Sequence, residues 1–220
     1  MQPPKTLRPT PLLTALAALL ALALAPLPGA TVSAQEAVAS RPAPSWGGGF
    51  RLGLFDMTNA ADSYDEVYGD PMPRLGFQLE RQRGHLRYSL SLDYGTVDGE
   101  RVLLGTGIGS GIDDGLTMIP VHFTAAWRFN PAAAWEWSAG LGPSFLSWEN
   151  DGVTTSESGS DFGGSAVVAL RRQGRQWDFA GELRWSTFPG ALDDLGGVVS
   201  FFDEDDPGGT SLTLAAVRRF

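Results

Sequence analysis

Residues 117–129, TMIPVHFTAAWRF, decide the fold because apolar and polar side chains alternate along them. From Ile119 to Phe129 every second residue is apolar, and the positions between them include His122 and Arg128. Successive side chains of a β-strand point to opposite faces, so this period of two predicts a strand with two chemically different faces. The same alternation recurs in segments 75–80, 86–94, 135–145 and 177–185, and more weakly in 46–57, 161–172 and 210–220.

The connections between these eight segments alternate between long and short. The long connections are 58–71, 99–115, 149–160 and 189–209, and the short ones are tight turns built from Gly or Asn-Pro at 83–84, 130–132 and 173–174. In a meander, successive turns lie at opposite ends, so all long loops share one end, as in outer-membrane barrels. The sequence therefore predicts an all-β fold, an eight-stranded antiparallel up-and-down transmembrane β-barrel. The even strand number predicts both termini at the short-turn end, in the periplasm.

The N-terminal segment has the pattern of a secretory signal. Lys5 and Arg8 precede an apolar run over 12–24, and the small residues Val32-Ser33-Ala34 follow it. The apolar run is shorter than the roughly 20 residues of a spanning helix, which favours a cleaved signal over an anchor. We expect three parts, namely a signal peptide at 1–34, a periplasmic linker at 35–45 and an outer-membrane barrel domain at 46–220.

The distribution of charge indicates which strand face meets lipid. A soluble barrel also alternates but turns its apolar face inward, so periodicity alone does not choose. Turning the apolar face outward exposes only Asp56, Arg81, Arg172 and Arg218, all at strand ends. A charge at the bilayer midplane costs about 2–4 kcal/mol, so this orientation is the one that lipid requires. The other face then forms an ion-paired lumen plug of Arg51, Arg74, Arg87, Arg128, Arg171, Arg184, Arg219, Glu80, Asp93, Glu136, Asp178 and Glu182.

Aromatic residues gather near the strand ends, as rings at a headgroup boundary do. The expected girdle at the turn end contains Trp46, Trp127, Trp135 and Trp177, and the expected girdle at the loop end contains Tyr94, Trp148 and Trp185. Proline at 120 and 143 lies within strands of a barrel that has no edge. We therefore expect a bulge or a missing ladder bond at each.

Net charge and composition exclude several classes of function. The formal charge of −9 argues against nucleic acid as a partner, and the absence of cysteine excludes disulfides and thiolate metal sites. The acidity lies almost wholly in the four long loops. Their carboxylates either bind a divalent cation, with Asp203, Glu204, Asp205 and Asp206 as the candidate cluster, or form a solvated acidic surface. Apolar residues at 198–202 add a candidate contact for an extracellular partner.

Three motifs complete the pattern: Gly140-Leu141-Gly142-Pro143-Ser144-Phe145, Ile119-Pro120-Val121 and the terminal Arg218-Arg219-Phe220. With the signal peptide and the meander, residues 46–220 resemble the small outer-membrane β-barrel superfamily that includes the OmpA transmembrane domain, OmpX and opacity-type proteins. The resemblance implies residence in the outer membrane of a two-membrane bacterium. It also implies that Phe220 is part of the signal read by the outer-membrane assembly machinery. Arg218 departs from the family pattern, which usually has an apolar or aromatic residue there.

The expected function is non-enzymatic, with an envelope-structural role and surface interactions through the acidic loops, and with no catalytic residue and no cofactor. Two alternatives stay open. One is a lipid-modifying barrel enzyme that uses His122, which shares the lumen face with Thr124. The other is a soluble periplasmic ligand-binding barrel. A conducting pore is disfavoured by the charge content of the lumen face.

Overall fold

The computed structural model describes residues 45–220 except 70, 104–107, 153–155 and 192–205. The predicted signal peptide at 1–34 and the linker up to residue 44 lie outside the described residues, and Ser45 already begins the first strand. Eight strands alternate with turns and loops, and one loop holds a short 3-10 helix and a short α-helix. The elements are β1 (Ser45–Asp56), η1 (Thr58–Ala60), α3 (Ala61–Val67), β2 (Met72–Arg83), β3 (Leu86–Leu103), β4 (Ile108–Arg128), β5 (Trp135–Gly152), β6 (Ser156–Arg172), β7 (Trp177–Thr187) and β8 (Gly209–Arg219). Within the described residues, no helix is long and apolar enough to span a membrane.

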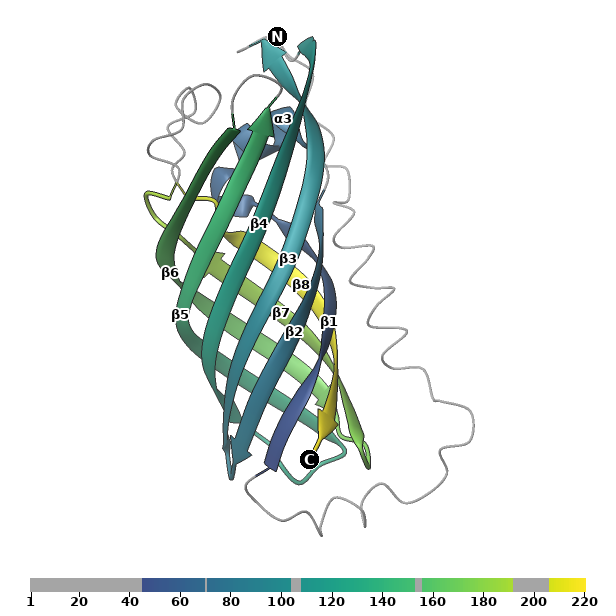
Figure 1. Cartoon of the computed structure of the whole chain (residues 1–220). Coiled ribbons are helices and arrows are strands. Elements are labelled where there is room, and N and C mark those ends of the chain that lie inside the picture. Colours follow the sequence, from purple (N-terminus) through teal and green to yellow (C-terminus); the bar gives the residue numbers. More distant parts are fainter. Residues whose placement is uncertain (1–44, 70, 104–107, 153–155, 192–205) are drawn as a thin grey trace, which may run out of the picture. The chain divides into compact units, whose positions relative to one another are not determined.

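Each strand pairs with its neighbours in sequence, and β1 also pairs with β8, so the sheet closes. All eight pairings are antiparallel. The predicted eight-stranded antiparallel up-and-down barrel is therefore confirmed. Figure 1 shows α3 at one end of the barrel and the C terminus at the other. Closure stabilises the sheet because it pairs the backbone N–H and C=O groups that the edge strands of an open sheet leave without partners.

Two of the predicted long loops are mostly strand. β3 and β4 continue to pair above the regular barrel, with Glu100 opposite Asp113, and the register shifts between Glu100 and Val102. β5 and β6 likewise pair as far as Asp151 opposite Ser156. The predicted loops at 99–115 and 149–160 were wrong in this respect, because ladder pairing continues where side-chain alternation stops. The loop at 58–71 holds η1 and α3.

The two strand prolines are accommodated without a shift of register. The ladder between β3 and β4 lapses after Leu92–Val121 and resumes at Gly95–Met118, flanking Pro120. The ladder between β4 and β5 lapses after His122–Ser144 and resumes at Ala125–Leu141, flanking Pro143. Proline has no N–H to donate, so ladder bonds are lost beside both residues. Of the two expected outcomes, the structure has the missing ladder bond and not the bulge.

The outward face of the barrel is apolar, with large exposed side chains on β1 to β7 and the half-buried Leu214 and Ala216 on β8. Its exposed side chains include Phe50, Leu52, Leu75, Phe77, Leu79, Leu90, Leu92, Phe123, Leu141, Phe162, Val168, Phe179 and Leu183. Charged residues on this face lie near strand ends, where Arg81 and Arg218 are exposed and Asp56 and Arg172 are half-buried. The inward face is buried and largely polar, so the molecule is inverted relative to a soluble barrel.

One predicted girdle residue was wrong. Trp148 is buried and its indole N–H donates to the carbonyl of Ala191 (3.2 Å). It shares strand parity with Ser144 and Leu146, both of which point inward, so alternation itself directs its ring to the interior. Tyr94 and Trp185 are exposed on the outer face as expected.

Candidate functional site

The interior near the turn end is organised around the carboxylate of Glu80, whose side chain has no exposed surface. Arg171 of β6 binds both of its oxygens through its two terminal nitrogens, each at 2.7 Å. Gln78 and Gln82 of the same strand donate to it at 2.8 and 3.0 Å, and Arg219 of β8 lies 3.3 Å away. Two-point arginine–carboxylate contacts are among the strongest hydrogen bonds in proteins. Glu80 therefore ties β2 to β6 and β8 across the lumen.

Glu136 forms a second node among β3, β4 and β5. Arg128 donates to its Oε2 from Nε (2.8 Å) and Nη2 (2.5 Å), and Gln173 donates to the same oxygen at 2.9 Å. Arg87 pairs with the other oxygen. Arg128 also donates to the carbonyl of Gly84 (2.8 Å), which links the node to the β2–β3 turn. Gly84 has a positive φ of 56°, which suits the one residue type without a Cβ.

Arg51 lies at the centre of a third node, with about 2% of its surface exposed. Its Nη1 donates to Glu182 (2.6 Å) and to Gln78 (2.8 Å), and its Nε donates to Asp93 (3.0 Å). Arg184 approaches Glu182 at 3.9 Å. The strands β1, β2, β3 and β7 therefore all contribute to one buried network.

Arg74 lies where the polar interior meets an apolar one. Its guanidinium carbon stacks over the ring of Phe55, 3.5 Å from the ring centroid, and its Nη2 lies 3.7 Å from the sulfur of Met118. A cation over an aromatic face is attracted by the ring quadrupole, and the attraction increases when water is excluded. Arg74 is therefore held by an aromatic ring and a thioether, whereas the other plug arginines contact carboxylates.

Together these contacts place every side chain of the predicted lumen plug inside the barrel. Seven arginines face five carboxylates, so the plug carries a formal excess of two positive charges. Hydroxyl side chains supply further partners, such as Thr124 and Ser165, which accept from Arg184 at 3.0 and 3.2 Å. An isolated buried charge is costly, and pairing of this density is what makes burial tolerable. The buried plug comprises Arg51, Arg74, Arg87, Arg128, Arg171, Arg184, Arg219, Glu80, Asp93, Glu136, Asp178 and Glu182.

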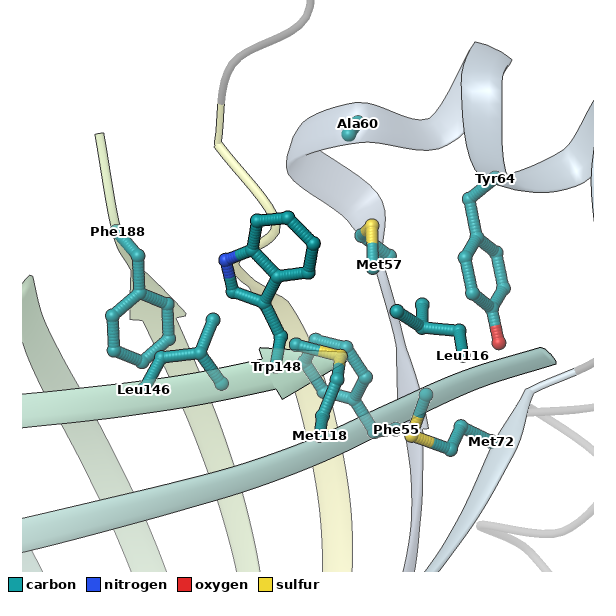
Figure 2. Close-up of a cluster of buried hydrophobic side chains, with 10 residues drawn as sticks. All are labelled: Phe55, Met57, Ala60, Tyr64, Met72, Leu116, Met118, Leu146, Trp148 and Phe188. Carbon is teal, nitrogen blue, oxygen red and sulfur yellow. The ribbon is translucent and has the colours of Figure 1, made fainter. Parts of the chain in front are cut away.

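Above this plug the interior becomes apolar at the loop end, a feature that sequence reasoning missed. The apolar cap is the cluster in Figure 2, made of Phe55, Met57, Ala60, Tyr64, Met72, Leu116, Met118, Leu146, Trp148 and Phe188. It draws on β1, η1, α3, β2, β4, β5 and the residue after β7. The sequence does contain a signal for the apolar cap: Phe55 lies on the same strand face as Arg51, and Met118 lies on the same face as His122, so both apolar side chains are expected to point inward.

The carboxylate of Asp206 accepts hydrogen bonds from residues at the edge of the apolar cap. Its Oδ1 accepts from the backbone N–H groups of Phe188 (2.6 Å) and Gly208 (2.7 Å). Its Oδ2 accepts from Asn59 (2.8 Å) and from the Thr187 hydroxyl. Both oxygens are therefore engaged within the protein. The other members of the predicted cation cluster, Asp203, Glu204 and Asp205, lie outside the described residues. Among the described residues, no group of three or more His, Asp or Glu side chains could hold a metal ion.

His122 lies inside the barrel with about 1% of its surface exposed. Its Nδ1 is 2.7 Å from the hydroxyl oxygen of Ser144 on the adjacent strand. Thr124, which shares its face, accepts a hydrogen bond from Arg184. Because the imidazole points into the lumen, it does not face the apolar outer surface. The second histidine, His85, is exposed in the β2–β3 turn and stacks on Trp127, with ring centroids 5.1 Å apart.

The C-terminal residue is the most exposed aromatic side chain described. About 76% of the surface of Phe220 is accessible, and its backbone N–H donates to the carbonyl of Trp46 (3.1 Å). This bond attaches the end of the chain to the start of β1.

Comparison with known proteins supports the fold. No family model and no curated protein matches this sequence. Among solved structures, a major outer membrane protein from Thermus thermophilus is similar over 81% of this chain and all of that one, with 15% identity and a TM-score of 0.55. The outer membrane protein OprG from Pseudomonas aeruginosa is similar over 80% of this chain and 95% of its own, with 11% identity and a TM-score of 0.51.

The class that fold and interior define is therefore the small, closed, eight-stranded barrel, and its solved structural neighbours are outer-membrane proteins. At identities of 11–15% the likeness extends to the fold alone.

Proposed function

We propose that this chain is an integral outer-membrane protein that acts without catalysis, as an anchored scaffold whose acidic loops contact partners outside the cell. The observation that carries the proposal is the apolar outer face, which is exposed on β1 to β7, is completed by the half-buried Leu214 and Ala216 of β8, and has charge only near its two rims. A soluble protein that exposed this surface would aggregate, whereas in a bilayer the surface is matched by hydrocarbon. In this orientation the loops face outward and both termini face the periplasm.

The surface role rests on the loop end. Exposed acidic residues follow the strand extensions that project there, including Asp98 on β3, Glu149 and Asp151 on β5 and Glu157 on β6. Carboxylates on a paired hairpin are held apart from the membrane surface and are available to a basic partner or to cations in solution. The lipid of the bilayer and the assembly machinery, which reads Phe220, complete the proposed set of partners.

The interior supports a non-conducting, non-enzymatic barrel. An eight-stranded barrel has room only for its own side chains, and here the ion-paired plug and the apolar cap occupy that space in series. The lipid-modifying alternative needs His122 to reach an acyl chain, and its inward orientation does not favour this. Lipid A and phospholipid profiles that differ between wild type and H122A cells would revive that alternative.

Comparison of unheated and boiled samples by SDS gel electrophoresis tests the proposal. A folded transmembrane barrel resists the detergent and migrates anomalously until it is boiled. Fractionation of cells gives an independent test, because the outer-membrane proposal requires the chain in the outer-membrane pellet. Recovery in the aqueous periplasmic fraction without detergent, with one mobility in both lanes, would instead support the soluble ligand-binding barrel.

A further inference from the structure

The outer face of the barrel repeats one arrangement of side chains at its turn end. At three strand pairs, a tryptophan lies opposite an arginine within a few residues of the turn, and at a fourth place a tryptophan stacks on a histidine. We call this set the Trp–cation ring. Its arginine pairs are Trp46 with Arg81 on β1 and β2, Trp135 with Arg172 on β5 and β6, and Trp177 with Arg218 on β7 and β8; Trp127, which stacks on His85 of the β2–β3 turn, completes the row of indoles.

The arginine pairs are set by strand register and not by chance proximity of long side chains. Trp46 lies directly opposite Arg81, and the guanidinium carbon is 5.4 Å from the indole centroid. Trp135 lies opposite Arg172, at 5.8 Å. An arginine held over an indole keeps its N–H edge free, and that edge matches the spacing of phosphate oxygens.

At the turn end of the barrel, the exposed charged side chains are arginines and the carboxylates are buried. Arg81, Arg83, Arg175 and Arg218 are exposed and Arg172 is half-buried. The carboxylates of this end, Glu80, Glu136 and Asp178, are buried in the lumen, where arginines bind them. Among the described side chains, no ion pair engages the three ring arginines.

We propose that the Trp–cation ring binds anionic glycerophospholipids of the leaflet at the turn end, with Arg81, Arg172 and Arg218 donating to headgroup phosphates. This inference rests on the proposed membrane function and adds a lipid preference to it. Indole rings partition to the headgroup boundary, so they fix the height at which the arginines meet phosphate. The apolar surface above the ring, which includes Leu79 and Phe179, lies where the acyl chains of the same lipids would run.

Native mass spectrometry of the full barrel tests the proposal, with phosphatidylglycerol and phosphatidylcholine of identical acyl chains as probes. The decisive variant is R81Q/R172Q, which removes two ring arginines. The matched control is R83Q/R175Q, which removes two arginines at the same end but outside the ring, so both variants have the same net charge. We expect wild type and the control to prefer phosphatidylglycerol. We expect the ring variant to lose about fivefold of that preference for each arginine removed.

Three results would overturn the inference: an undiminished preference in R81Q/R172Q, an equal loss in both double variants, or displacement of the bound lipid by inorganic phosphate at constant ionic strength. The first would show that the ring is not the site, the second that only diffuse charge acts, and the third that phosphate alone is the ligand. Gel mobility of the same unheated samples separates this outcome from failure of the membrane proposal. A heat-modifiable barrel without lipid preference would overturn the ring alone.

Discussion

Glu80 provides the sharpest test of how the barrel is held together. Its carboxylate has no exposed surface and is shared by Arg171 through two bonds at 2.7 Å, with Arg219 at 3.3 Å and Arg87 at 3.9 Å. The substitution E80Q keeps the size of the side chain but removes the charge. Among the described side chains, Asp178, at 3.6 Å, is the carboxylate that then still pairs with Arg171. Removing one partner of a buried pair costs about 3–5 kcal/mol because the other charge is left uncompensated.

Urea unfolding of the barrel in vesicles, followed by tryptophan fluorescence, measures this loss. We expect the midpoint to fall with an unchanged denaturant slope, since the surface exposed on unfolding stays the same. E149Q is the matched control, because Glu149 is exposed and the same substitution there changes stability by no more than about 0.5 kcal/mol. The double variant E80Q/R171M should recover part of the loss, because it also removes the positive charge that E80Q leaves without its main partner, although Arg219 and Arg87 still lack the Glu80 carboxylate.

A free energy of unfolding for E80Q within about 0.5 kcal/mol of wild type would refute the reasoning. It would mean that the buried arginines near Glu80 do not depend on its charge. A double variant whose loss of stability equals the sum of the losses of the two single variants would contradict the pairwise account in a different way, since additivity would show that the two side chains stabilise the barrel independently of each other.

Three further predictions concern the outer face, the cap and the chain end. L90R, midway between Leu86 and Tyr94 on the outer face of β3, should destabilise the barrel in vesicles by about 2–4 kcal/mol, whereas L86R, at the strand end, should cost about 0–1 kcal/mol; equal costs would count against a bilayer around the apolar outer face. D206A should leave the backbone N–H groups that Asp206 binds without their acceptor, and limited proteolysis of folded barrels should cut the loop after β7 faster than in D161A. Deletion of Phe220 should reduce the amount of barrel assembled in cells without changing refolding in vitro, and parallel losses in both assays would show a role in stability instead.

Much of the barrel is readable from alternation alone. The inward set that contains Arg51, Glu136 and Glu182 follows from parity along each strand, because a strand between lipid and a packed lumen sorts its side chains strictly. Alternation does not specify partners. That Arg51 meets Glu182, 131 positions away, depends on closure and stagger of the barrel, which no local pattern encodes.

The errors have related causes. Where β3 and β4 extend beyond the barrel, lipid no longer contacts one strand face and a packed lumen the other. Residues 99–115 therefore lose the alternation of apolar and polar side chains, while the backbone ladder continues. Trp148 was assigned by its residue type and position in the chain, although the parity it shares with Ser144 directs it inward. The apolar cap was missed because parity separates inside from outside but does not say that the interior changes from polar to apolar along the barrel axis.

The sequence distances between plug partners constrain how the chain reaches its membrane. Arg171 and Glu80 are 91 positions apart, and Arg219 and Asp178 join the last two strands. An open sheet of four or five strands would present unneutralised guanidinium groups to hydrocarbon, where nothing can solvate them. Insertion of single strands with these arginines facing hydrocarbon is therefore costly. We expect the hairpins to gather with their charged sides shielded from the acyl chains before the seam between β1 and β8 closes.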